Sequence, residues 1–318
     1  MPVEFRAVSD PSRDLLEQVS ALAPENPFYT FEYVRARQSR GSDAHVLYLK
    51  ADGRVSSACT AFSRHGRLNH RLEITSLPSI SDPAAFWKGL RQFCRESRVS
   101  ILDIHTFGSN ETAIPKLDGE VSRRSRYEYQ IDLRNTDLWG GLHRRHQRHI
   151  KKALKAGLVL RRTTDPRDCA IHTSLANTAL TRRRDHGHTI ASEIKDQDSL
   201  TYLKHNAGEI FQALLDGEVF SSILVLKSSK GAYAQTSGTT SDGRDLGASQ
   251  LLFYETACIF QKESLDVFNL GGTDLESRGL QDFKASFGSK RLDLEAAEFH
   301  FGGVVKKTIG KLIETFRG

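Results

Sequence analysis

The chain has 318 residues and a formal net charge of +6, with 38% hydrophobic and 26% charged residues. This composition is ordinary for a globular protein, and the length predicts one large domain or two of medium size. No apolar run approaches the roughly 18 residues of a membrane span, and the N-terminus lacks the apolar core of an export signal, so we expect a cytoplasmic protein.

The first half of the sequence alternates between strand and helix patterns. In chain order it predicts a strand at 3–8, a helix at 14–23, strands at 44–50, 54–63 and 70–77, a helix at 83–93, and strands at 99–105 and 127–133. Asp52-Gly53 lies between two of these strands, which is a strong signal for a tight hairpin.

The second half repeats this order of elements. It predicts a helix at 138–156, a strand at 158–163, a helix at 167–183, a polar loop up to His205, strands at 209–215, 218–227 and 231–240, a helix at 247–262 and a strand at 265–270. Asp216-Gly217 marks a second hairpin. We therefore expect mixed α/β structure in two related domains, residues 1–135 and 136–303, and a C-terminal helix at 304–318 that docks on the body.

The helix predicted at 138–156 carries the most concentrated charge in the chain. Residues 134–167 contain seven arginines and three lysines against two aspartates. An apolar stripe is expected from Leu138, Leu142, Ile150, Ala153 and Leu154, and a basic face from Arg144, Arg148, Lys151 and Lys155, with Arg145 and Lys152 alongside. Like charges on one helix face repel each other, so the face is either simply solvated or binds a polyanion such as a nucleic acid.

Histidines and cysteines do not indicate a metal site. His143, His146 and His149 are spaced by three, but the arginines and lysines around them would repel a cation, so we expect solvated histidines. Cys59, Cys94, Cys169 and Cys258 are scattered without ligand spacing, and we expect reduced, buried thiols.

The strand predicted at 265–270 ends at Gly271-Gly272, where we expect bare backbone amides. The chain returns through Phe283 and Phe287, which can anchor a helical turn that holds Lys284 beside them. A cation fixed next to unpaired amides could receive developing negative charge in a reaction.

Two other segments could bind substrate. Tyr233, Gln235 and Ser237 alternate along one strand, and they line either a cleft or a solvent-facing side of a sheet. Arg244, Gly247 and Ala248 resemble the turn with which GNAT-type acetyltransferases hold a pyrophosphate on a helix N-terminus, although Ser249 replaces the last small residue. An ordinary loop and helix cap is the alternative.

These residues together resemble the Fem-type (FemABX-like) aminoacyltransferases, a branch of the GNAT superfamily with two GNAT-like domains and a central cleft. The resemblance covers nearly the whole chain. It rests on the segment Leu142–Leu160, which is similar to the family's basic helix leading into A-x-K-x-G-[VL], and on the strand around Tyr233–Gly238. Above all it rests on NLGG at Asn269–Gly272 followed by FKASFG at Phe283–Gly288.

The resemblance implies transfer of an amino acid from aminoacyl-tRNA to an amine, on a peptidoglycan precursor or a peptide-like metabolite, with no bound cofactor. It implies that Lys284 stabilises the oxyanion and that Arg35 binds substrate phosphate. Here Phe31 stands in place of the family's tryptophan in W-x-x-V-K, and Leu77-Pro78-Ser79 in place of its Pro-Arg-Gly-Pro segment. The acceptor therefore stays open.

The expected site residues fall into two groups around Lys284. Expected to bind substrate are Arg35, Tyr233, Gln235, Ser237, Asn269, Gly271, Gly272 and Phe283. Expected to bind the donor are Arg144, Arg148, Lys151, Lys152, Arg183, Arg244 and Gly247. The amine proton could pass to Asp274, Glu276, Asp282 or the substrate. An acyl-CoA N-acyltransferase and a non-catalytic anion-binding module are the alternative functions.

Overall fold

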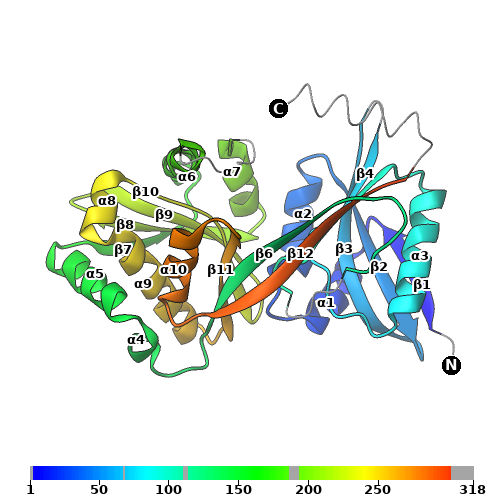
Figure 1. Ribbon diagram of the computed structural model, residues 1–318, viewed down its shortest axis with the longest axis horizontal. Helices are drawn as coiled ribbons and strands as arrows, with labels where there is room; N and C mark the ends of the chain where they lie inside the picture. Colours follow the sequence, from blue (N-terminus) through cyan, green and yellow to red (C-terminus); the bar gives the residue numbers. More distant parts are fainter. Residues whose placement is uncertain (1–2, 67–68, 110–113, 186–192, 302–318) are drawn as a thin grey trace. The chain divides into compact units, whose positions relative to one another are not determined.

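The computed structural model describes residues 3–66, 69–109, 114–185 and 193–301 (Figure 1). The chain forms two compact units: the first comprises Met1–Leu22, Gly41–Arg126 and Asp293–Gly318, and the second comprises Ala23–Arg40 and Tyr127–Leu292. The units thus exchange segments, whereas the domains expected from the sequence were continuous. The helix predicted at 304–318 lies outside the described residues.

Within its described residues, the first unit is a mixed sheet with two helices. Its elements are β1 (Glu4–Ser9), α1 (Arg13–Leu22), β2 (Asp43–Ala51), β3 (Arg54–His65), β4 (His70–Ile74), α3 (Pro83–Glu96), β5 (Ile101–His105) and the ends of β6 (Glu120–Asp132) and β12 (Lys290–His300) that belong to this unit. Strands β1 to β4 form an antiparallel meander, β5 is parallel to β4, and β12 is antiparallel to β5.

The second unit repeats this topology. Its further elements are η1 (Pro27–Tyr29), α2 (Phe31–Gln38), α4 (Leu138–Gly141), α5 (Arg144–Lys155), β7 (Val159–Thr163), α6 (Asp168–Asp185), α7 (Asp196–Lys204), β8 (Gly208–Leu215), β9 (Glu218–Lys227), β10 (Gly231–Thr239), α8 (Ser241–Leu246), α9 (Ala248–Lys262), β11 (Val267–Asp274) and α10 (Arg278–Ala285). Strands β7 to β10 form the meander, β11 is parallel to β10, and β6 completes the sheet beside β11.

Both predicted hairpins are confirmed. Asp52 and Gly53 have φ of 51° and 80°, and Asp216 and Gly217 have φ of 50° and 85°. Positive φ at both central residues is the geometry of the tight turns that match the twist of paired strands.

Two predicted elements are wrong in detail. The segment before His205 contains the helix α7 rather than only a polar loop. The basic helix is interrupted: Gly140 and Gly141 end the short α4, and α5 begins only after His143, whose ring accepts a hydrogen bond from the Arg145 amide. Adjacent glycines have low helix propensity, which accounts for the break.

The main core of the second unit lies between its sheet and the helices α5, α9 and α10 (Figure 1). Phe211, Phe260 and Phe268 are among its fully buried side chains. Helix α6 covers the opposite face of this sheet, where the buried ring of His172 contacts the hydroxyls of Ser222 at 2.9 Å and Thr236 at 2.8 Å.

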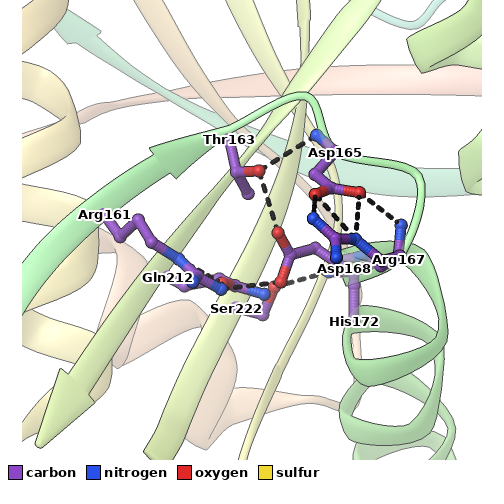
Figure 2. A network of polar contacts seen from close by, with 8 residues as sticks. All are labelled: Arg161, Thr163, Asp165, Arg167, Asp168, His172, Gln212 and Ser222. Atoms are coloured by element: carbon purple, nitrogen blue, oxygen red, sulfur yellow. Dashed lines mark hydrogen bonds and ion pairs between the residues drawn. The ribbon is translucent and has the colours of Figure 1, made fainter. Parts of the chain in front are cut away.

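A polar network fixes the start of α6 (Figure 2). Asp168, in the first turn, accepts hydrogen bonds from Arg161 at 2.6 Å and from the Thr163 hydroxyl at 2.8 Å, and both donors lie on β7. Negative charge at a helix N-terminus is also favoured by the helix dipole. The helix that covers this face is therefore tied to the sheet by polar contacts rather than by apolar packing alone.

Candidate active site

The site is built where β10 and β11 stop pairing. These parallel strands are matched only at Gly231 with Val267, Ala232 with Phe268, and Tyr233 with Asn269, although both strands continue beyond that point. Tyr233 and Asn269 are therefore the last cross-strand pair. Their side chains lie beside each other on the face of the sheet that α6 covers.

A buried glutamate on β6 joins this last pair. Glu128 has 0% of its surface exposed, and its two carboxylate oxygens accept hydrogen bonds from the Tyr233 hydroxyl and the Asn269 side-chain amide, each at 2.7 Å. A buried carboxylate needs such partners because its desolvation costs several kcal/mol. Glu128 was not among the site residues expected from the sequence.

The backbone at Gly271 is occupied, which corrects the expectation of bare amides. The strand does not end at Leu270 but continues to Asp274, and the Gly271 amide donates to Asn269 Oδ1 at 2.8 Å. Gly271 has φ of 76°, and a Cβ there would lie 2.6 Å from the Ala234 carbonyl oxygen, so only glycine fits.

Lys284 reaches this turn from α10. Its side chain is 6% exposed, and Nζ donates to the carbonyl oxygens of Gly271 at 2.8 Å and Gly272 at 3.0 Å. The ammonium is thus held by carbonyls rather than placed beside free amides. The position of its charge is fixed at the point where β10 and β11 diverge.

Helix α5 supports α10 directly. His146 is buried, its ring packs on Phe283 and Phe287, and Nε2 lies 2.9 Å from the Phe283 carbonyl oxygen. Burial lowers the pKa of His146 to about 4, so the ring is neutral at pH 7 and Nε2 donates. The expectation of a solvated histidine is wrong at this position, because three residues along the helix bring His146 round to the apolar face.

The alternation of Tyr233, Gln235 and Ser237 on one face does not hold. A bulge between Ala234 and Thr236 shifts the register of β10 against β9, so Thr236 takes the face of Tyr233. Ser237 pairs with the core residue Ile223 and belongs to the other face. A bulge of one residue reverses the alternation of side chains along a strand, and no sequence pattern predicts this bulge.

Arg35 lies apart from the Glu128 network. It is exposed on α2 and donates to Gln38 at 3.1 Å. The same segment does reach the site through Phe28, whose ring meets Tyr233 edge-on at 4.9 Å. The segment 23–40 therefore covers the site with an aromatic side chain.

The basic face of α5 is exposed as expected. Arg144, Arg145, Arg148, Lys151, Lys152 and Lys155 are all exposed, and within the described residues none of them has an acidic partner. Lys152 donates to the Asp245 carbonyl at 2.7 Å. The predicted apolar stripe is wrong at Leu154, which is 52% exposed, and His146 completes the stripe instead.

The turn at Arg244–Gly247 is helical. Arg244 belongs to α8, and the amides of Gly243, Arg244 and Gly247 are bonded to Thr240 and to Arg244 itself. Gly247 links α8 to α9 with φ of 84°, and a Cβ there would lie 2.5 Å from the His149 carbonyl oxygen. Its glycine is therefore required for packing, whatever α9 binds.

The acidic candidates for proton transfer lie on the surface. Asp274 is ion-paired with Arg183 at 2.9 Å, so a predicted base and a predicted donor-binding residue neutralise each other. Glu276 and Asp282 are exposed. Across the described part of the chain no group of three or more potential ligands could hold a metal ion, and no described helix is long and apolar enough to cross a membrane.

Residues 142–285 match a family model described as an acetyltransferase (GNAT) domain. Among solved structures, FemX has 12% identity and a TM-score of 0.69, covering 97% of this chain and 100% of that one. A tandem GNAT protein from the clavulanic acid biosynthesis pathway has 13% identity and a TM-score of 0.57, covering 95% and 99%.

L-PGS from Bacillus licheniformis has 11% identity and a TM-score of 0.52, covering 96% of this chain and 97% of that one. A search of curated protein sequences finds no match. At these identities the solved structures establish a common fold, and they confirm the predicted GNAT-like α/β architecture.

Proposed function

We propose that the chain is an acyltransferase of the GNAT superfamily and that it transfers an amino acid from aminoacyl-tRNA to an amine acceptor. The match of residues 142–285 to a GNAT domain model and the fold shared with FemX support this proposal. The acceptor amine attacks the ester carbonyl, a C–N bond forms, the C–O bond to the tRNA ribose breaks, and the ribose hydroxyl leaves with the proton. An ester is already activated, so the protein has to orient the substrates and stabilise the oxyanion.

The observation that carries this proposal is the fixed ammonium of Lys284. It is almost fully buried and two backbone carbonyls hold it at the divergence of β10 and β11. A charge that is already placed needs no reorganisation when the tetrahedral oxyanion forms, and a low-dielectric surrounding strengthens its effect. We assign Lys284 as the catalytic residue that faces the oxyanion.

The basic face of α5 supports tRNA as the donor carrier. Six exposed cations, without acidic partners among the described residues, suit the many phosphates of a nucleic acid better than the single pyrophosphate of CoA. The amides at Arg244–Gly247 are bonded within α8, which weighs against a pyrophosphate site in that turn. The acceptor we propose is an amine on a peptidoglycan precursor or a peptide-like metabolite.

Replacing Lys284 by methionine tests the chemistry. With bulk tRNA charged with radiolabelled amino acids and a mixed pool of small peptides, we expect formation of the amide product to fall by about 100-fold or more. The matched control is Lys290→Met, which removes an exposed lysine from the same unit and should leave the rate unchanged.

Two results would contradict the proposal. A Lys284→Met protein with undiminished transfer would remove Lys284 from the mechanism. Purification of the native protein at low salt with bound CoA and no RNA would reverse the choice of donor, since the absorbance ratio and mass spectrometry distinguish the two.

A further inference from the structure

Glu128 connects three strands at the point where the site opens. It lies on β6 and accepts hydrogen bonds from Tyr233 on β10 and Asn269 on β11. A fully buried carboxylate that adds no apolar contact area is a costly way to join strands that already share a sheet. The presence of this buried charge therefore calls for an explanation other than packing.

The reason lies in the orientation of the Asn269 side chain. Both oxygens of Glu128 accept, so the amide nitrogen of Asn269 must face Glu128 and its oxygen must face the other way. That oxygen accepts the Gly271 amide at 2.8 Å. Glu128 therefore determines which end of Asn269 meets the backbone of the Gly271 turn.

The backbone turn at Gly271 also sets the direction of the two carbonyls that bind Lys284. With its amide bound by Asn269 and its φ at 76°, Gly271 directs its own carbonyl and that of Gly272 toward Nζ. A continuous chain of hydrogen bonds thus runs from Glu128 through Asn269 and Gly271 to the ammonium. Such chains fix geometry more strongly than separate contacts do.

We propose that Glu128 is the positioning residue for Lys284, acting through the orientation of the Asn269 amide. We assign Glu128 no proton transfer in the reaction. The effect of Glu128 on catalysis rests on the function proposed above. The effect of Glu128 on the placement of the ammonium does not, and each effect has its own test.

The test uses a swap of donor and acceptor. In Glu128→Gln the new amide can accept from Tyr233 but turns its nitrogen toward the Asn269 nitrogen, so one bond is lost and Asn269 is free to flip. In the double variant Glu128→Gln with Asn269→Asp, glutamine donates to aspartate, and the other aspartate oxygen still accepts the Gly271 amide. All three hydrogen bonds are restored with one reversed.

The readout is the acetylation rate of Lys284 by trace acetic anhydride, measured by peptide mass spectrometry relative to the exposed Lys290. We expect a rise of about tenfold in Glu128→Gln, because the ammonium loses its fixed carbonyls. The double variant should return to within about threefold of the natural protein. Thermal unfolding midpoints are recorded for every variant.

Three outcomes overturn the proposal. If Glu128→Gln is less stable but Lys284 is acetylated at the original rate, Glu128 serves packing only. If the double variant folds and Lys284 stays reactive, the charge at position 128 matters rather than the amide orientation. If the single variant does not fold, the double variant alone decides, and a reactive Lys284 in it refutes the relay. Loss of transfer activity in Lys284→Met is a separate result, and its absence would refute the function without touching the relay.

Discussion

His146 packs its ring between Phe283 and Phe287 and donates to the Phe283 carbonyl, one residue before Lys284. A neutral imidazole suits this place because one nitrogen supplies the donor while the ring fills an apolar gap. The residue thus links the basic helix to the helix that carries Lys284, although its own charge plays no part.

The pH dependence of stability should reveal this buried ring. Burial lowers the pKa of His146 to about 4 in the folded protein. In the unfolded chain the same ring binds a proton near pH 6.5, so protonation between pH 6.5 and 4 favours unfolding. The contribution is complete above pH 6.5 and is lost as the pH falls toward 4, by roughly 3 kcal/mol. Urea unfolding of His146→Gln, which keeps the donor but does not titrate, should show a correspondingly shallower loss.

The informative quantity is the difference in unfolding free energy between the natural protein and His146→Gln. His172 is also buried with a pKa of about 4, so it destabilises both proteins in acid. Parallel curves for the natural protein and His146→Gln between pH 6.5 and 4 would mean that His146 is protonated in the folded state. The hydrogen bond to Phe283 would then need another explanation.

At the scale of elements, α5 combines two functions on two faces. Ile150 and Ala153 are fully buried in the core, and the cations stand in solvent. Helical periodicity makes this separation possible, and mutual repulsion on the basic face is tolerated because water screens exposed charges. The same helix therefore anchors the unit and offers a polyanion surface.

Reversing three of these charges should weaken binding of bulk tRNA and reduce its dependence on salt. For Arg144→Glu, Arg148→Glu and Lys151→Glu together, we expect the slope of log affinity against log salt to fall by about 2 to 3, because each phosphate contact contributes about one unit. Fluorescence anisotropy with labelled tRNA at several salt concentrations measures both quantities.

The matched control is on α3, where Lys88, Arg91 and Arg95 are exposed at similar helical spacing. Reversing these three charges changes the net charge equally and should leave the slope almost unchanged. An equal loss in both triple variants would show that binding follows net charge alone, and the assignment of α5 would fail.

At the scale of the whole molecule, each unit is completed by a strand that follows the other unit's meander in sequence. Strand β12 comes after β11 but pairs with β5, and β6 comes after β5 but lies beside β11. The pairing of β12 with β5 joins residues almost 200 positions apart, such as Ala296 and His105. Neither unit is therefore a continuous stretch of chain.

A fragment that ends at residue 135 should not fold as an independent domain. It lacks β12, so β5 becomes an unpaired edge and the buried side chains of Leu294 and Phe299 are missing from the core. We expect no cooperative thermal transition by circular dichroism for residues 1–135 alone, and recovery of one when residues 136–318 are expressed with it. A cooperative transition of the short fragment by itself would show that β12 is dispensable.

The sequence by itself determined the features that depend on residues close together in the chain. The Asp-Gly turns, the repeated order of strands and helices, the basic face of α5 and the position of Lys284 beside two aromatics are all local patterns, and local patterns survive in the linear chain. The sequence also predicted the GNAT-like fold, through NLGG and FKASFG.

Only the tertiary structure decided which residues and strands contact each other across the fold. In the sequence Glu128 is one polar residue in an alternating strand, with nothing to distinguish it from the exposed Asp132. Its burial and the exchange of β6 and β12 depend on strands brought together from more than 100 residues away, whereas the bulge at Gln235 depends on how β10 pairs with the neighbouring strand β9. Hydrogen bonds between residues so far apart form only when the core has folded, so no periodic pattern in the sequence predicts them.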